Sequence, residues 1–233
     1  MVQTDCQKSD KDYKGDHVIE IEIRKLTLKE KLKRGHFLYF GYYWLYEKYY
    51  DRLIAKKDMS RMLPNDATFP VQSLDYRILR LFEKEFTADD RDLTVDVGSG
   101  WGRTLGFLLL KKNKGRFIGI EINREAAEFS KKVFSANERV GIFNGDAVEI
   151  VPPDATKLIL FNPFPRKVLS AFLDTVELRC GDGVLLYYLN PEYEAELTER
   201  GCWILKEKKT LCPKYHIPVH LSVYRLYDRG DCI

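Results

Sequence analysis

Long apolar runs and histidine are both scarce in this chain, which has 233 residues and 4 histidines. A membrane-spanning helix needs about 20 consecutive apolar residues, and no segment approaches that length. The first five residues, Met1 to Asp5, lack the charged and apolar regions of a signal peptide. We therefore expect no membrane-spanning segment and a cytoplasmic location.

Cysteine is also sparse, with 5 residues and no Cys-x-x-Cys pair. An odd number without that spacing is typical of free thiols in a reducing compartment. His216 and His220 are the one histidine pair with i,i+4 spacing, but Pro218 between them breaks the helix that would direct both rings to a metal. We expect no metal site.

The charges are nearly balanced, because 38 basic and 35 acidic side chains leave a formal net charge of +3. This balance does not favour a nucleic-acid or membrane partner. A hydrophobic content of 45% in a chain of this length is sufficient for one globular core. The oligomeric state stays open at this stage.

The most informative segment is a glycine turn between an apolar strand, residues 93–97, and an apolar helix, residues 105–110. Its glycines are Gly98, Gly100 and Gly102, whereas a dinucleotide fingerprint would place its third glycine one position later. Such a turn lets backbone N–H groups approach a ligand at a helix N-terminus. Asp96 at the strand end would repel a pyrophosphate, but it suits a ligand with an amino group and a sulfonium charge, such as S-adenosylmethionine.

The next three predicted strands also end in polar or turn residues. Residues 117–122 contain Glu121, which is 23 positions after Gly98 and placed to accept ribose hydroxyls. Asn123 is expected to open a helix over 124–136. Residues 140–144 precede Asp146, a candidate for the adenine amino group, and residues 157–161 precede Asn162 in an Asn-Pro-Phe-Pro loop. A helix after this loop can begin only once the prolines are passed.

This ordered series of motifs, VDVGSGWG, GIEIN, NGDA and LILFNPFP, resembles that of class I S-adenosylmethionine-dependent methyltransferases over roughly residues 72–226. The resemblance implies S-adenosyl-L-methionine as the cofactor. It places Gly98 and Gly100 along the methionine moiety, with Asp96 near the amino group, and Gly102 of the same turn is also expected to bind the cofactor. It also implies Glu121 on the ribose and Asp146 or Ala147 near the adenine. Trp101 and Phe143 either stack on the cofactor or fill the core.

The remaining predicted elements complete an α/β fold. Strands are expected over residues 183–189, 203–208 and 219–226, with a helix over 192–199. By resemblance, the last strand inserts antiparallel next to the fifth. The expected fold is a doubly wound, mostly parallel sheet of seven strands in the order 3-2-1-4-5-7-6, with an N-terminal helical and aromatic extension.

The first 70 residues form that extension, and residues 71–233 form the expected cofactor-binding core. Residues 18–23 alternate like a strand, residues 28–32 favour a helix, and residues 64–70 form a proline-bounded hinge before a helix over 74–86. Residues 37–50 are rich in aromatic and leucine side chains. They are interpreted either as a helix that buries its rings on the sheet end or as a lid over the methyl-acceptor pocket.

Asn162 and Phe164 are the candidates for chemistry. Methyl transfer is an in-line displacement, so the protein must mainly hold the acceptor. In related amino-group methyltransferases an Asn or Asp, two prolines and an aromatic do this, but here the aromatic comes one position early, which does not favour a nucleobase acceptor. The alternative is a rigid turn with a packed Phe164.

The predicted function is methyl transfer to nitrogen or oxygen of a small molecule, a saccharide or a protein side chain. The alternatives are a nicotinamide-dependent oxidoreductase on a similar fold and a non-catalytic binding protein. The glycine spacing and the absence of a Tyr-x-x-x-Lys pair after the core disfavour the oxidoreductase.

Overall fold

The computed structural model describes residues 36–55, 74–212 and 218–227. Its strands are β1 Leu93–Val97, β2 Arg116–Glu121, β3 Val140–Asn144, β4 Lys157–Phe161, β5 Leu185–Leu189, β6 Trp203–Leu211 and β7 Val219–Leu226. Its helices are α3 His36–Ala55, α4 Tyr76–Glu85, α5 Arg103–Leu110, α6 Arg124–Phe134, α7 Ala147–Ile150, α8 Arg166–Arg179 and α9 Ala195–Thr198.

The strands form one sheet in the order β3-β2-β1-β4-β5-β7-β6. Strands β1 to β5 pair in parallel, and β7 runs antiparallel to both β5 and β6. This order confirms the seven-stranded topology predicted from the sequence. All five residues of the central strand β1 are buried, as expected for a parallel strand covered on both faces.

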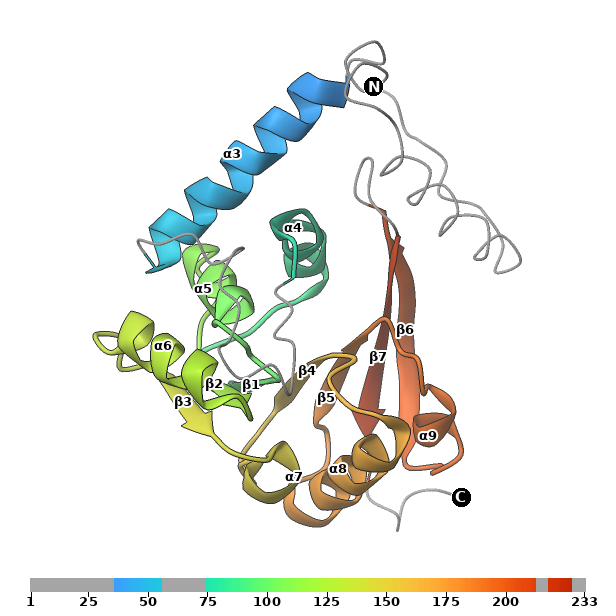
Figure 1. Ribbon diagram of the computed structural model, residues 1–233. Helices are drawn as coiled ribbons and strands as arrows, with labels where there is room; N and C mark the ends of the chain where they lie inside the picture. The colour runs from blue at the N-terminus through green and yellow to red at the C-terminus, as the bar shows by residue number, and fades with distance from the viewer. Residues whose placement is uncertain (1–35, 56–73, 213–217, 228–233) are drawn as a thin grey trace.

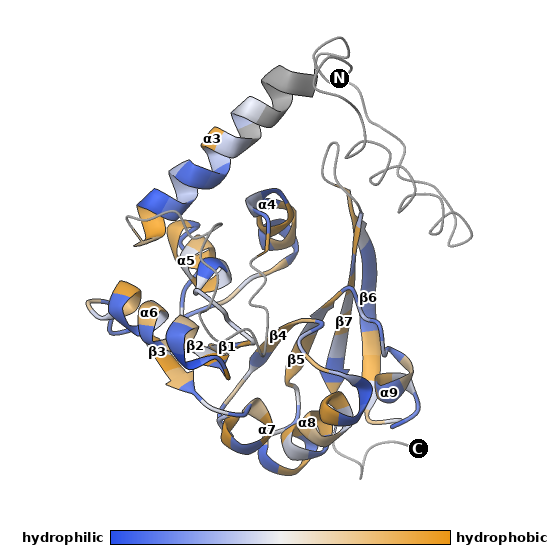
Figure 2. Ribbon diagram, in the orientation of Figure 1, coloured by the Kyte–Doolittle hydropathy of each residue, from blue (hydrophilic) through white to orange (hydrophobic). Residues whose placement is uncertain are grey.

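Each face of the sheet carries its own hydrophobic core. One core joins the sheet to α4, α5 and α6 through side chains such as Phe82, Phe107 and Phe134. The other joins it to α7, α8 and α9 through Ala147, Phe172 and Leu197. Figure 1 shows these helices in two layers, and Figure 2 shows hydrophobic colouring on the central strands against a largely hydrophilic upper part of β6.

Two helices begin at residues whose side chains cap them. The carboxylate of Asp75 accepts from the N–H of Arg77, and the carbonyl of Asn123 accepts from the N–H of Ala126, so these residues cap α4 and α6. Helix α8 begins directly after Pro165, as its prolines predict. The positions of the prolines and caps therefore fix where the strand-end loops turn into helices.

Several sequence predictions need adjustment. The helix expected over 192–199 is reduced to α9, Ala195–Thr198, and the carboxylate of Glu194 just before it accepts from the hydroxyls of Ser222 and Tyr224 on β7 at 2.6 and 2.7 Å. Strand β5 starts two residues later than expected, and β6 is longer. Residues 18–23, 28–32 and 64–70 lie outside the described residues. Cys180 and Cys202 are not in a disulfide, but Cys212 is disulfide-bonded, which corrects the prediction that all cysteines are free thiols.

The aromatic segment 37–50 lies in one helix, α3, whose C-terminal half packs on α5. A Cβ on Gly106 would lie only 2.4 Å from Cγ2 of Ile54, so this contact needs glycine. The rings of Tyr46 and Tyr50 join the core, but a second group of apolar side chains on α3 is exposed: Tyr42, Trp44, Leu45, Tyr49 and Leu53. Burial of the aromatic run is therefore only partial.

The described residues contain neither a candidate membrane span nor a candidate metal cluster. No helix among them combines the length and the apolar character that a membrane span needs. No group of three or more His, Cys, Asp or Glu side chains in the same part of the chain is arranged to hold a metal ion.

Candidate active site

A cavity of about 700 Å³ opens where the carboxyl ends of the parallel strands meet. Open α/β sheets bind ligands at this edge. Seven of the nine residues predicted from the sequence line the cavity: Asp96, Gly98, Glu121, Asp146, Ala147, Asn162 and Phe164. The structure thus brings together side chains that are spread over four strand ends.

The three glycines of the turn do different things. Gly98 has a left-handed φ of 75°, and an added Cβ would lie 3.0 Å from Cβ of Pro163, so the turn packs directly on the loop after β4. Gly100 donates its N–H to Glu121 Oε2 at 2.7 Å. Gly102 is not among the cavity-lining residues, and a Cβ there would lie 2.6 Å from the Phe134 ring on α6. Its geometry shows a packing role between α5 and α6.

Two buried carboxylates stand at the ends of the neighbouring strands β1 and β2. Glu121 accepts N–H groups at both oxygens, from Gly100 and Asn123, each at 2.7 Å. Asp96 differs, because its Oδ2 is buried with no hydrogen-bond partner. Burial, with a further contribution from the charge of Glu121, raises the pKa of Asp96 to about 7.

An unpartnered buried carboxylate oxygen is costly, so it indicates a place where a ligand donates. The hydroxyl of Ser99 in the same cavity is likewise buried without a partner. A ligand carrying a positively charged amino group would satisfy Asp96. These residues therefore fit the methionine end of S-adenosylmethionine.

The end of the cavity near β3 is built by a short helix start. Asp146 accepts the N–H of Val148 at 2.9 Å and so caps α7, while Ala147 is buried beneath it. Trp101 and Phe143 are not among the residues that line the cavity. Trp101 is 1% exposed and packs edge-on against Phe129, whereas Phe143 is half exposed. Trp101 thus fills the core.

The loop after β4 holds the other predicted pair. Asn162 has a left-handed φ of 44°, and both ends of its amide are engaged. Its Oδ1 accepts from the hydroxyl of Tyr188 at 3.0 Å, and its Nδ2 donates to Glu192 at 2.6 Å. Phe164 lines the cavity and also packs on Phe172 of α8, with ring centroids 5.3 Å apart.

Sequence reasoning missed four polar residues that line the cavity: Ser99, Arg103, Thr104 and Asn190. Ser99 lies inside the glycine turn, where its small size gave no signal of its own. Asn190 could have been found, because Asn190-Pro191 after β5 repeats the Asn-Pro sequence after β4. Arg103 could not, since its partners lie in a distant segment.

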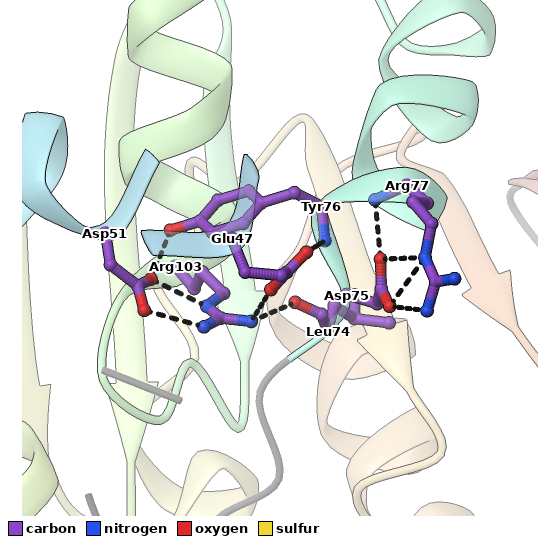
Figure 3. A network of polar contacts seen from close by, with 7 residues as sticks. All are labelled: Glu47, Asp51, Leu74, Asp75, Tyr76, Arg77 and Arg103. Atoms are coloured by element: carbon purple, nitrogen blue, oxygen red, sulfur yellow. Dashed lines mark hydrogen bonds and ion pairs between the residues drawn. The ribbon is translucent and has the colours of Figure 1, made fainter. Parts of the chain in front are cut away.

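Arg103 starts α5 and is the centre of a buried polar network with α3 (Figure 3). Its guanidinium donates to both oxygens of Asp51, to Glu47 at 2.7 Å and to the carbonyl of Leu74 at 3.0 Å. The hydroxyl of Tyr76 donates to Asp51 at 2.7 Å. Burial raises the pKa of Tyr76, so its hydroxyl stays protonated. The network joins α3 to the cavity wall.

Comparisons with known proteins agree with this architecture. A family model described as methyltransferase small domain matches residues 63–178, about half of the chain. Among curated proteins, no sequence match was found.

Three solved structures share the fold at low sequence identity. The pyocyanin biosynthetic protein PhzM is 14% identical, with a TM-score of 0.56 over 65% of this chain and 55% of that one. The mitomycin 7-O-methyltransferase MmcR is 15% identical, with a TM-score of 0.52 over 65% and 54%. The M1A22 tRNA methyltransferase TrmK of B. subtilis is 14% identical, with a TM-score of 0.56 over 68% of each chain. The chain thus spans little more than half the length of PhzM and MmcR.

The strand order, the antiparallel β7 and the family match define a Rossmann-like methyltransferase. The fold and the family match point to a class I S-adenosylmethionine-dependent methyltransferase, with S-adenosylmethionine as the methyl donor.

Proposed function

We propose that this enzyme methylates a nitrogen or oxygen atom of a small molecule, a saccharide or a protein side chain, with the donor bound along the glycine turn. The observation that carries the donor site is the buried, unpartnered Oδ2 of Asp96 in the cavity. Among the lining residues, it is the group best suited to accept the amino group of the donor.

The other donor contacts follow from the lining residues. Glu121 is held in place by two backbone N–H groups, so its carboxylate is preorganised to accept ribose hydroxyls on its remaining lone pairs. Gly98 and Gly100 give the backbone close access to the methionine moiety. Asp146 and Ala147 mark the adenine end of the cavity.

The donor supplies an electrophilic methyl group on a positively charged sulfur. The protein then has to hold the acceptor in line and exclude water. Phe161, Pro163, Phe164 and Pro165 form a mainly apolar wall for this at the β4 end. Asn162 orients the loop but is not a general base at neutral pH.

The N-terminal extension is proposed as a substrate cover, with residues 71–233 as the core. Its described helix, α3, contacts the cavity wall through Glu47 and Asp51, which accept from Arg103, and several apolar side chains of α3 are exposed. The printed names of the structural neighbours include both a 7-O-methyltransferase and a tRNA methyltransferase. The shared fold alone therefore does not select the acceptor.

Incubation with a donor carrying a tritiated methyl group tests the proposal. The full chain is assayed against a panel of amines, phenols, saccharides and peptides. We expect label to appear on nitrogen or oxygen of one panel member. Transfer to carbon, or no transfer to any member by protein that binds the donor, would contradict the proposed acceptor class.

A further inference from the structure

Two similar strand-end turns, one after β4 and one after β5, lie side by side at the acceptor end of the cavity. Strands β4 and β5 are parallel neighbours, with Phe161 paired to Leu189. Each is followed by Asn-Pro, and both asparagines have a left-handed backbone, with φ of 44° at Asn162 and 48° at Asn190. Such a φ is uncommon outside glycine, although asparagine tolerates it better than most residues. Both asparagines line the cavity.

The side chains of Asn162 and Asn190 differ in their hydrogen bonds. In Asn162 both ends of the amide are used, by Tyr188 and by Glu192. Tyr188 is buried and its pKa is raised to about 12 by that burial, so its hydroxyl remains a donor at neutral pH. The amide of Asn162 is therefore held by the protein at both ends, although one N–H and one oxygen lone pair are not used by these two bonds.

Only one end of the Asn190 side-chain amide, the oxygen, forms a hydrogen bond with the residues that the structure describes. Its Oδ1 accepts the backbone N–H of His220 on β7 at 3.0 Å, and its own N–H donates to the carbonyl of His220 at 2.7 Å. A backbone N–H can only donate, so the amide atom facing it has to be oxygen. The amide orientation is thereby fixed. Its Nδ2 makes no hydrogen bond to any residue in the described part of the chain.

We propose that Asn190 is an acceptor-binding residue, whose Nδ2 donates a hydrogen bond to a carbonyl oxygen or ring nitrogen of the methyl acceptor. This inference rests on the proposed function. The apolar wall of Phe161, Pro163, Phe164 and Val168 suits a planar, largely apolar molecule. The acceptor class is thus a planar compound with a hydrogen-bond-accepting atom beside its methylated nitrogen or oxygen, and Asn162 is a positioning residue for the turn after β4.

Benzamide and benzylamine are probes that test whether Asn190 donates a hydrogen bond to the bound molecule. Benzamide is planar and carries a carbonyl oxygen, whereas benzylamine at pH 7 is a cation with donors only. Binding is measured by NMR titration of the full chain saturated with S-adenosylhomocysteine. We expect the wild-type protein to bind benzamide at least about fivefold more tightly than benzylamine.

Two variants and one control complete the test. Asn190→Asp keeps an oxygen for the His220 N–H and replaces the NH₂ group by a charged oxygen, so benzamide affinity should fall about tenfold and benzylamine affinity should rise. Asn190→Gly keeps the left-handed backbone and should also lose benzamide affinity. The control is Asn137→Asp, because Asn137 likewise accepts a backbone N–H, from Arg139, but is not among the cavity-lining residues. It should behave as wild type.

The outcomes separate the inference from the proposed function. Unchanged benzamide affinity in both Asn190 variants, or no benzamide binding by wild-type protein that binds S-adenosylhomocysteine, would overturn the role of Asn190. Failure of the wild-type protein to bind S-adenosylhomocysteine would instead overturn the proposed donor site.

Discussion

Asp51 and Arg103, which are 52 positions apart, form a buried two-pronged ion pair with Nε–Oδ1 and Nη2–Oδ2 distances of 3.1 and 2.9 Å. Asp51 is fully buried and Arg103 is 4% exposed. Arg103 begins the helix that follows the glycine turn and lines the cavity. The extension is therefore attached to the core at the wall of the proposed donor site.

Asp51→Asn should lower the free energy of unfolding by about 3 kcal/mol, because it leaves a buried guanidinium facing an NH₂ group. Urea denaturation followed by circular dichroism measures this. The control is Asp154→Asn, whose partner Arg116 lies 2.7 Å away but is 63% exposed. Loss of this exposed pair should cost less than about 1 kcal/mol. Equal effects in the two variants would show that burial of the Asp51 pair does not matter.

Replacing two exposed apolar side chains of α3 tests the proposed cover. Leu45 and Tyr49 are 60% and 59% exposed, so Leu45→Ser with Tyr49→Ser should change stability by less than about 1 kcal/mol. If α3 covers the acceptor, turnover should fall at least about fivefold while donor affinity stays the same. Leu178→Ser on α8, which is 84% exposed, serves as the control. Wild-type turnover in the α3 variant would argue against a cover.

Substitutions of Asn162 should slow methyl transfer to different extents. Asn162→Ala removes both amide anchors at a left-handed position, so methyl transfer should slow by about 10- to 1,000-fold through poor positioning, with donor affinity nearly unchanged. Asn162→Gly restores the backbone freedom but not the anchors. Its kcat should recover only in part. Full recovery would mean that the backbone turn alone is needed, and steady-state kinetics with the acceptor found in the panel assay decide between the two.

Asp96 should make the stability of the free protein depend on pH. Its pKa is about 7 when folded, against an ordinary value of 3.8, so the folded state binds more protons between these values and its stability falls as pH rises through that window. Asp96→Asn removes this penalty. The variant should exceed wild type in free energy of unfolding by roughly 1–3 kcal/mol at pH 8 and by much less at pH 4.5. A difference that is the same at both pH values would contradict the shifted pKa.

The sequence was sufficient for the parts of the site that depend on local order. The acids and glycines at the ends of β1 and β2, and the prolines before α8, act within a few residues of their own strand or helix, so their positions were predictable. The sequence predicted that Gly102 binds the ligand. In the structure Gly102 packs against Phe134 of α6, a contact that the local sequence does not reveal because the two residues are brought together only by the tertiary fold. The ion pair between Asp51 and Arg103 could not be predicted from the sequence pattern, because it joins two helices that are far apart in the chain.

The donor site is tested most directly by calorimetric titration of S-adenosylmethionine into wild-type protein and Asp96→Asn at pH 8, with NAD as the competing ligand. The account predicts one donor bound per wild-type chain, an affinity about 10- to 100-fold weaker in the variant, and no heat from NAD. It also predicts that wild-type affinity falls as the pH is lowered from 8 to 6, because Asp96 must lose its proton to hold the amino group. Equal donor affinity in the two proteins, or binding of NAD in place of the donor, would contradict it.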